Sequence, residues 1–154
     1  MSIAFRMASS SDAEELTRIA FAAKRHWGYP EDWIALWADE LRIGADYIEA
    51  NWVILAAAGS RTLGWCAVSA ERGECWLDNC WVLPEAAASG IGRALVGRAL
   101  RHAAGLSSPT LRVISDPNAE GFYLKLGFRR IGDHPSEPVG RRLPVLEVKV
   151  EHAA

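Results

Sequence analysis

Two helices are predicted near the start of the chain from the spacing of their apolar residues. The first should run over 12–27, because apolar side chains recur there at steps of three or four: Ala13, Leu16, Ala20, Ala23 and Trp27. Ser11 and Glu14 have the pattern of a capping box, and Gly28-Tyr29-Pro30 ends the helix. The second helix should reach about Arg42, with one apolar face: Trp33, Ile34, Trp37 and Leu41. We expect the two helices to form a hairpin.

The periodicity changes at Trp52, where runs rich in β-branched and aromatic residues begin. Turn residues separate these runs, so they predict a meander of three antiparallel strands at 52–58, 63–70 and 75–83. A short strand is also expected before the first helix, at 2–7. The second half of the chain should supply three more strands, at 110–115, 128–131 and 143–150.

The glycine turn Ser89-Gly90-Ile91-Gly92 opens another amphipathic helix, which should end at Gly105. Because this helix joins the strands at 75–83 and 110–115, it predicts a crossover between parallel strands. A short helix is expected from Pro117-Asn118 to Leu126, and the proline-rich stretch 133–142 is expected to be a loop that lines a pocket. The element order indicates an α/β protein with a mixed α+β sheet, a single sheet of seven strands with about four helices.

Composition limits the classes of function. The chain has 154 residues, 50% of them apolar, which suffices for one domain over 1–154. No apolar run approaches the roughly 20 residues that cross a bilayer, so we expect a cytoplasmic protein. The formal charge of −2 favours neither nucleic acid nor membrane as a partner. The cysteines lie in apolar segments without a CxxC pair, which favours core packing over a metal site: Cys66, Cys75 and Cys80.

The glycine turn is also the strongest chemical signal. Backbone N–H groups at the start of a helix point toward a common anion position, which most naturally takes a phosphate. A Walker loop is excluded because Arg93 and Ala94 follow Gly92 in place of Lys and Ser or Thr. A dinucleotide-binding turn is disfavoured because Leu95 stands at its last glycine position. The two glycines could alternatively serve only close packing of the helix against the sheet.

The segment around Gly90-Ile91-Gly92 resembles the central motif of the GNAT superfamily of N-acetyltransferases, which follows that fold's fourth strand. The stretch DPNAEGFYLKLGF, at 116–128, is similar to the second motif of that superfamily. The resemblance covers essentially the whole chain, because the element order is also that of the GNAT fold. Ala87 departs from the pattern, since the family carries Gln or Arg there, and Arg93 offers a nearby cation.

The resemblance implies acetyl-CoA as co-substrate and direct transfer of its acetyl group to an amine. It implies that the backbone of Trp81, Val82 and Leu83 pairs with the pantetheine arm. The pyrophosphate would be held by the backbone N–H groups of six residues: Ala88, Ser89, Gly90, Ile91, Gly92 and Arg93. Asn118 would contact the cofactor as well, although it also suits the cap of a helix. The resemblance implies no metal.

Tyr123 is the candidate general acid by the same resemblance, since a Tyr pKa near ~10 suits protonation of a departing thiolate. Asp78 is the first candidate for the general base, with Glu74, His26 and His134 as reserves. Both Tyr123 and Asp78 have a structural interpretation, as a core tyrosine and as a loop-binding carboxylate. A covalent route through Cys80 or Cys75 is less favoured because no activating base is evident.

An aromatic cluster near the helix hairpin is expected to border the acceptor site. We predict that Trp27, Tyr29 and Trp33 contact the substrate, while the other rings of the cluster serve the core. The acceptor could be a small amine, an amino acid, an antibiotic or a peptide N-terminus, and a small-molecule amine is preferred. A GNAT-like module that binds acyl-CoA without turnover, and an enzyme that uses longer acyl groups, remain alternatives. Exposed strand ends and the stretch 135–142 leave room for a homodimer.

Overall fold

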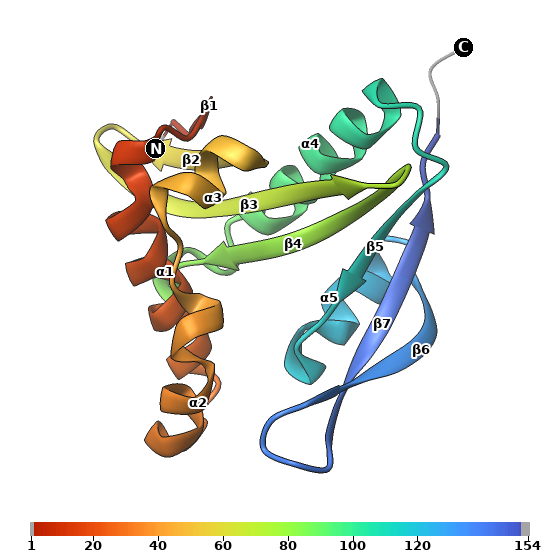
Figure 1. Ribbon diagram of the computed structural model, residues 1–154. Helices are drawn as coiled ribbons and strands as arrows, with labels where there is room; N and C mark the ends of the chain where they lie inside the picture. Colours follow the sequence, from red (N-terminus) through yellow and green to blue (C-terminus); the bar gives the residue numbers. More distant parts are fainter. Residues whose placement is uncertain (1, 152–154) are drawn as a thin grey trace.

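The computed structural model describes residues 2–151, and its strands form one mixed sheet (Figure 1). The strand order is β1-β2-β3-β4-β5-β7-β6, and all neighbours are antiparallel except the parallel pair β4 and β5. The predicted seven-stranded mixed sheet and the parallel crossover are therefore confirmed. The strands are β1 (Ala4–Met7), β2 (Trp52–Ala58), β3 (Arg61–Glu71), β4 (Glu74–Val82), β5 (Thr110–Ile114), β6 (Arg129–Ser136) and β7 (Arg141–Lys149).

Helices cover both faces of the sheet. They are α1 (Ala13–His26), α2 (Glu31–Leu41), α3 (Ala45–Ala50), α4 (Ile91–Gly105) and α5 (Glu120–Lys125). Two consecutive residues of β3 show which helix lies on which face, because successive strand side chains point in opposite directions. The Trp65 indole donates to the Leu16 carbonyl of α1 at 3.0 Å, whereas the Cys66 thiol donates to the Leu95 carbonyl of α4 at 3.7 Å. Both side chains are fully buried, so the core has one layer on each side of the sheet.

The start of α1 differs from its prediction. The reciprocal cap is made by Ser9 and Asp12, not by Ser11 and Glu14, because a short 3-10 turn over Ser10–Asp12 precedes the α-helix. The Asp12 carboxylate accepts the Ser9 N–H at 2.8 Å and is also paired with Arg6 at 2.9 Å. That ion pair with Arg6 lowers the pKa of Asp12 to about 2.

Two other segments differ from the sequence prediction. The short helix α3 was not expected, because it has a single buried residue, Ile48, and so leaves no periodic pattern. The stretch 133–142 is mostly strand, with β6 reaching Ser136 and β7 beginning at Arg141. Pro135 is tolerated within β6 because this strand lies at the edge of the sheet. Only residues 137–140 form the turn between the two strands.

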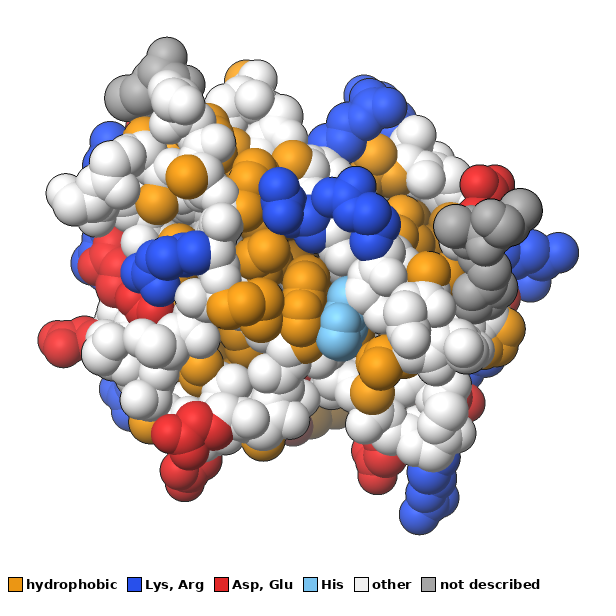
Figure 2. Space-filling view, turned by 90° about the horizontal axis from the view of Figure 1, so that it is seen from above, with side chains coloured by type: hydrophobic (Ala, Val, Ile, Leu, Met, Phe, Trp, Pro, Cys, Tyr) orange, Lys and Arg blue, Asp and Glu red, His pale blue; other side chains and the backbone are white. Residues whose placement is uncertain are grey.

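The surface seen from above Figure 1 carries apolar side chains that gather in its middle, bordered by basic residues (Figure 2). Strand β2 and helix α4 lie on this side of the molecule (Figure 1). They are connected by Trp52, whose ring stacks on that of His102 with 4.5 Å between centroids. No helix among residues 2–151 is long and apolar enough to cross a membrane.

A β-bulge in β4 opens the sheet. Ala67 faces Asn79 and Val68 faces Leu77, so Asp78 is an extra residue without a partner on β3. A bulge bends its strand and increases the local twist. Beside β5, the strand β4 is paired only at Cys75 and Trp76, before the bulge. Past it the two strands diverge in a V between the half formed by β1 to β4 and the half formed by β5 to β7 (Figure 1). The region between the diverging strands is called the V-shaped opening below.

Gly64 is required where α4 begins against the sheet. A Cβ atom at this position would lie 3.0 Å from the Trp81 carbonyl oxygen and 3.2 Å from side-chain carbons of Ile91 and Val82. We expect Gly64→Ala to lower the free energy of unfolding by about 1–3 kcal/mol, because the crowded core must shift. Urea denaturation followed by circular dichroism measures this change.

Gly97→Ala is the matched control on α4. A Cβ atom there meets no heavy atom within 4 Å, so the same substitution should stabilise by about 0.5–1 kcal/mol through helix propensity. Equal effects at the two positions would contradict the close approach of α4 to β3.

Candidate active site

The end of β4 presents unpaired backbone groups to the V-shaped opening. In an antiparallel pair, successive residues direct their N–H and C=O groups alternately toward and away from the partner strand. The Leu83 N–H donates to the Leu63 carbonyl at 2.8 Å, so Leu83, and by alternation Trp81, face β3. The backbone N–H and C=O groups of Val82 and Cys80 therefore point to the opening. Of the three residues whose backbone was expected to pair with the pantetheine arm, Trp81 and Leu83 thus direct their backbone groups to β3, and only Val82 directs them to the opening.

The start of α4 provides a second set of donors. Gly90 caps the helix with φ +84°, a conformation that favours glycine, and the first helical bond runs from the Ala94 N–H to the Gly90 carbonyl. The N–H groups of the first turn, Ile91 to Arg93, therefore have no helical acceptor. Ser89 differs from the prediction, because its N–H donates to the Ala86 carbonyl at 3.1 Å. Among the described residues, the amides of Ala88 and Gly90 make no backbone hydrogen bond.

Gly92 has a packing role that the sequence did not distinguish from ligand binding. A Cβ atom at Gly92 would lie 3.2 Å from the Phe122 ring, so its absence lets α5 approach α4. Phe122 in turn packs edge-on against Tyr123, with 5.0 Å between ring centroids. The glycine thus helps to place Tyr123 beside the opening.

Tyr123 points from α5 to the part of β4 that lies beyond the bulge. Its side chain is buried, and its hydroxyl neighbours the thiol of Cys80. Burial, reinforced by the neighbouring thiol, raises the pKa of Tyr123 well above its ordinary value, which keeps the hydroxyl protonated. Burial also raises the pKa of Cys80 to about 12, partly offset by the neighbouring Tyr123 hydroxyl. A thiol with so high a pKa is a poor nucleophile, and Cys75 is buried as well.

A pocket of about 460 Å³ lies on the opposite face, between the helix hairpin and the opening. Its inner wall combines aromatic, amide and charged side chains: Lys24, Trp37, Tyr47, Asp78, Asn79, Trp81, Asp116 and Arg141. Ile114 and Leu143 add apolar surface, and the exposed residues Asp39, Glu40 and Arg42 also border it. The pocket therefore reaches the splayed end of β4 from the side opposite to Tyr123.

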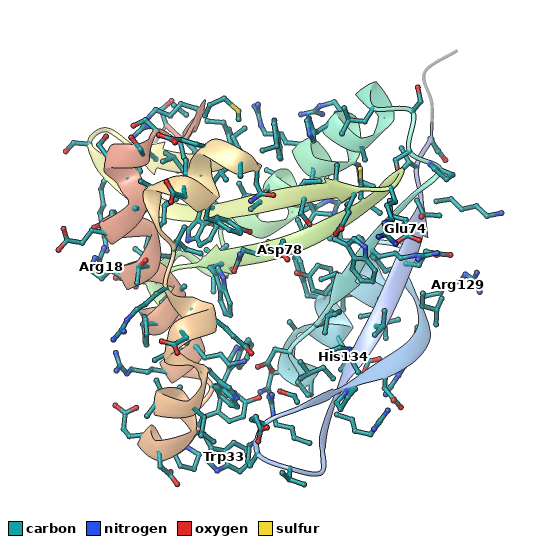
Figure 3. The ribbon with its side chains drawn as sticks, in the orientation of Figure 1. Arg18, Trp33, Glu74, Asp78, Arg129 and His134 are labelled. Atoms are coloured by element: carbon teal, nitrogen blue, oxygen red, sulfur yellow. The ribbon has the colours of Figure 1, made fainter. Side chains whose placement is uncertain are left out.

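Asp78 faces this pocket from the bulge (Figure 3). Its carboxylate accepts the Tyr47 hydroxyl at 2.5 Å, and Tyr47 accepts the Asn79 amide at 2.8 Å. Burial, followed by the Asp78 hydrogen bond, raises the pKa of Tyr47, so this hydroxyl remains a donor. The Trp81 indole donates to Asn79 at 2.9 Å and extends the chain of contacts. Asp78 is thus held in one orientation beside the opening.

The reserve candidates for a general base do not line the pocket. Glu74 lies at the far end of β4, paired with Arg112 at 3.2 Å (Figure 3). His134 is exposed on β6, and His26 is exposed at the end of α1 beside Trp27. Asp78 is the only one of the four that the fold brings to the pocket.

The predicted aromatic cluster is present, because the rings of Tyr29, Trp33 and Trp37 contact one another. The rings that border the pocket are not the three that were predicted to contact the substrate. Trp27 is 45% exposed and Trp33 stacks on Tyr29 at 5.9 Å, and neither lines the pocket. Tyr29 does not line it either, although its hydroxyl contacts two residues that do, Asp116 and Arg141. Trp37 and Trp81 form the aromatic wall. The signal for Trp37 was its place on the buried face of the second helix, the face that turns toward the pocket.

Asp116 is the residue that the sequence prediction missed. It accepts from Lys24 Nζ at 2.6 Å and from the Tyr29 hydroxyl at 3.0 Å, and Arg141 lies 3.6 Å away. Its carboxylate also accepts the Asn118 N–H at 2.8 Å, so Asp116 rather than Asn118 caps the turn before α5. The Asn118 side-chain amide donates to the Tyr29 hydroxyl at 3.0 Å. The side chain of the predicted cofactor ligand is thus bonded to the cluster around Asp116.

Known proteins match this architecture. The family of acetyltransferase (GNAT) domains matches residues 49–130. The PaiA N-acetyltransferase of Thermoplasma acidophilum, solved with coenzyme A, is 20% identical with a TM-score of 0.80, over 97% of this chain and 99% of that one. The putative acetyltransferase YncA of Salmonella typhimurium, solved with acetyl-CoA, is 22% identical with a TM-score of 0.69, over 100% and 98% of the two chains.

A third structure is the ribosomal-protein-S18-alanine N-acetyltransferase of Escherichia coli, which is 17% identical with a TM-score of 0.72 and covers 99% of this chain and 97% of that one. A search of curated protein sequences found no match. The family match spans more than half of the chain, from β2 to the beginning of β6. The chain belongs to the GNAT acetyltransferase family.

Asp116 should be essential for stability, because its loss leaves two buried cations without their carboxylate. We expect Asp116→Asn to lower the free energy of unfolding by about 3–5 kcal/mol. Burial alone would raise the pKa of Asp116, but Lys24, the Asn118 N–H and Tyr29 hold it below its ordinary value. The stabilisation is therefore present above the unfolded pKa near ~4 and is lost as the pH falls through the folded value.

Acid titration of the unfolding midpoint tests this prediction. The wild type should lose stability below about pH 4 faster than Asp116→Asn, which has no carboxylate to protonate. Asp133→Asn, which removes an exposed partner of Arg142, should leave the midpoint near that of the wild type. Equal effects of the two variants would contradict the role of Asp116.

Proposed function

We propose that residues 1–154 act as one acetyl-CoA-dependent N-acetyltransferase domain, which transfers an acetyl group directly to the amine of a small molecule. One observation carries the proposal. The splayed end of β4 presents unpaired backbone groups at a point reached by the α4 N-terminus and Tyr123 on one face and by the Asp78 pocket on the other. Acyl transfer needs donor and acceptor sites that meet at one point.

The residues fit coenzyme A by their donors. The N–H groups of Ile91, Gly92 and Arg93 would hold the pyrophosphate, helped by the positive end of the α4 dipole. Gly90 leaves open space above this turn, since a Cβ atom there would meet nothing within 4 Å. Arg93 is exposed and, within residues 2–151, makes no ion pair, so its charge is available to a phosphate. The related structures that hold coenzyme A and acetyl-CoA support this assignment.

The pantetheine arm would lie along Val82 and Cys80 as an additional strand, since their backbone groups face the opening. The Val82 N–H would then be aimed at the thioester oxygen, where negative charge develops during attack. When bound, acetyl-CoA supplies a thioester carbonyl carbon that a neutral amine can attack.

Two side chains would move the protons. Asp78, directly or through water, would take the proton that the acceptor amine loses as its nitrogen bonds to the acetyl carbon. Tyr123 would give its hydroxyl proton to the sulfur that leaves when the carbon–sulfur bond breaks. The raised pKa of Tyr123 keeps that proton in place until the thiolate forms. No covalent enzyme intermediate is needed.

A non-catalytic module that binds acyl-CoA is the second candidate, and the burial of Tyr123 against Cys80 favours it. A tyrosine that is only 5% exposed and lies next to a thiol also fits a role in the core. An enzyme that acetylates a peptide or protein amine is the third candidate.

Arg93→Glu tests the cofactor site without disturbing the helix, because an acidic residue suits the first helical turn. We expect acetyl-CoA to bind at least about tenfold more weakly, which corresponds to about 1.4 kcal/mol. Calorimetric titration measures the change. Arg101→Glu, an exposed position farther along α4, should leave the affinity within about twofold of the wild type. Undiminished affinity in Arg93→Glu would place the phosphates elsewhere.

Tyr123→Phe distinguishes the enzyme from the binding module. The variant should lose about 10²–10⁴-fold in kcat while keeping its affinity for acetyl-CoA, because a general acid contributes that much to the rate. Release of free thiol in the presence of a panel of amines measures turnover. A binding module has no turnover to lose, so no thiol release by the wild type would contradict the enzyme, and an unchanged kcat in Tyr123→Phe would contradict Tyr123 as the general acid.

A further inference from the structure

The deep end of the acceptor pocket has more positive than negative charge. Lys24 and Arg141 both contact Asp116, at 2.6 Å and 3.6 Å, and no second carboxylate is paired with them within residues 2–151. The side chains of all three are nearly buried, with 10%, 11% and 7% of their surface exposed. Two cations therefore share one carboxylate at a site where water screens poorly.

Other charged groups around the pocket do not remove this excess. Glu40 and Asp39 are exposed on α2, where water solvates them, and Arg42 lies close to them. Asp78 lies at the other end of the pocket, where it is bonded to Tyr47. Burial lowers the pKa of Lys24 and is opposed first by Asp116; Arg141 adds to the lowering, and the exposed Glu40 opposes it with the smallest effect of these groups. The two cations thus raise each other's energy when no further anion is near.

Both cations have donors left for a ligand. Arg141 uses its guanidinium for the Tyr29 hydroxyl at 2.9 Å and Ser136 at 3.4 Å, out of five N–H groups. Lys24 has three donors, and Asp116 accepts one of them. Both side chains line the pocket. A planar guanidinium next to an ammonium is well suited to a carboxylate.

Aromatic rings hold the two cations in place. The Lys24 ammonium lies 4.4 Å from the Trp37 ring centroid, and the Arg141 guanidinium lies 4.5 Å from the same ring. The Lys24 ammonium also lies 6.0 Å from the Trp81 ring centroid, and the Trp81 indole donates to Asn79. Asn79 donates to the Tyr47 hydroxyl, which donates to Asp78. The pocket therefore has a cationic end and a carboxylate end on a shared wall.

We infer that the acceptor is a small amino carboxylic acid, whose carboxylate binds Lys24 and Arg141 while its amine points to the opening near Asp78. The inference rests on the proposed function, because it names the acceptor class of that transferase. A bound carboxylate would balance two cations with two anions. A peptide N-terminus is disfavoured, because an amide stands where an amino acid has its carboxylate.

Matched pairs of ligands test the inference on the full chain with saturating coenzyme A. The probes are L-alanine, L-leucine, L-phenylalanine, L-glutamine and β-alanine, each compared with its carboxamide by calorimetric titration. In at least one pair, the carboxylate should bind tenfold or more tightly than the carboxamide, about 1.4 kcal/mol. Equal or weaker binding of the carboxylate in every pair, including no binding at all, would overturn the inference.

Three variants assign the preference to the cluster. Arg141→Gln and Lys24→Met each leave one cation with Asp116, a balanced pair, and should reduce the carboxylate preference to less than about threefold. Arg142→Gln removes the same charge from an exposed position outside the pocket and should keep the preference. If Arg141→Gln does not fold, Lys24→Met makes the same test. A preference that survives in a folded cluster variant would also overturn the inference.

Acetyl transfer measured on the same probes separates the two proposals. Transfer to carboxamides as fast as to carboxylates in every pair would overturn the acceptor class and leave the transferase intact. A carboxylate preference in binding with no transfer to any probe would support the cationic site and remove support for the transferase.

Discussion

The buried ion pair between Lys24 and Asp116 is the interaction on which the active-site region depends. It joins α1, which packs on the half of the molecule formed by β1 to β4, to the connection after β5 in the other half. The sheet itself cannot hold these halves together at that end, because β4 and β5 pair at only two positions. The Trp37 indole adds a second tie, donating to the Glu137 carbonyl at 2.9 Å. Charge and aromatic contacts therefore replace missing ladder hydrogen bonds across the opening.

Asp78 has both a structural position in β4 and a carboxylate at the pocket. It is the extra residue of the bulge at which β4 bends away from β5, and its carboxylate is one of those that line the pocket. On the other face of the same strand, Cys80 contacts Tyr123, the candidate acid. Because the two faces of a strand alternate, a few residues of β4 can carry the candidate base on one side and contact the candidate acid on the other. The divergence of β4 from β5 after the bulge places Asp78 and Tyr123 beside the same opening.

The element order, the parallel crossover and the glycine turn could be predicted because each depends on local spacing or on turn residues. The reach of β6 to Ser136 could not, since Pro135 normally argues against a strand and only its edge position permits it. Asp78 became a candidate because it lies on the strand before a recognisable motif, and the structure places it at the pocket. Asp116 was missed because its importance comes from Lys24 and Arg141, which are 92 and 25 residues away in sequence and meet it only after folding. Local patterns predict backbone turns well, whereas charge clusters assembled from distant segments leave no pattern.

The divergence of β4 from β5 also creates a sheet edge inside the molecule. Exposed edges usually attract other strands and promote aggregation, so proteins shorten, charge or cover them. Here the unpaired groups of Val82 and Cys80 lie between helices on the two faces of the sheet, with Tyr123 beside them. A polypeptide strand with side chains on both faces would meet these walls, whereas a thin, unbranched amide chain would not. If the pantetheine arm pairs here as proposed, the fold keeps the pairing capacity of a free strand for one slender ligand.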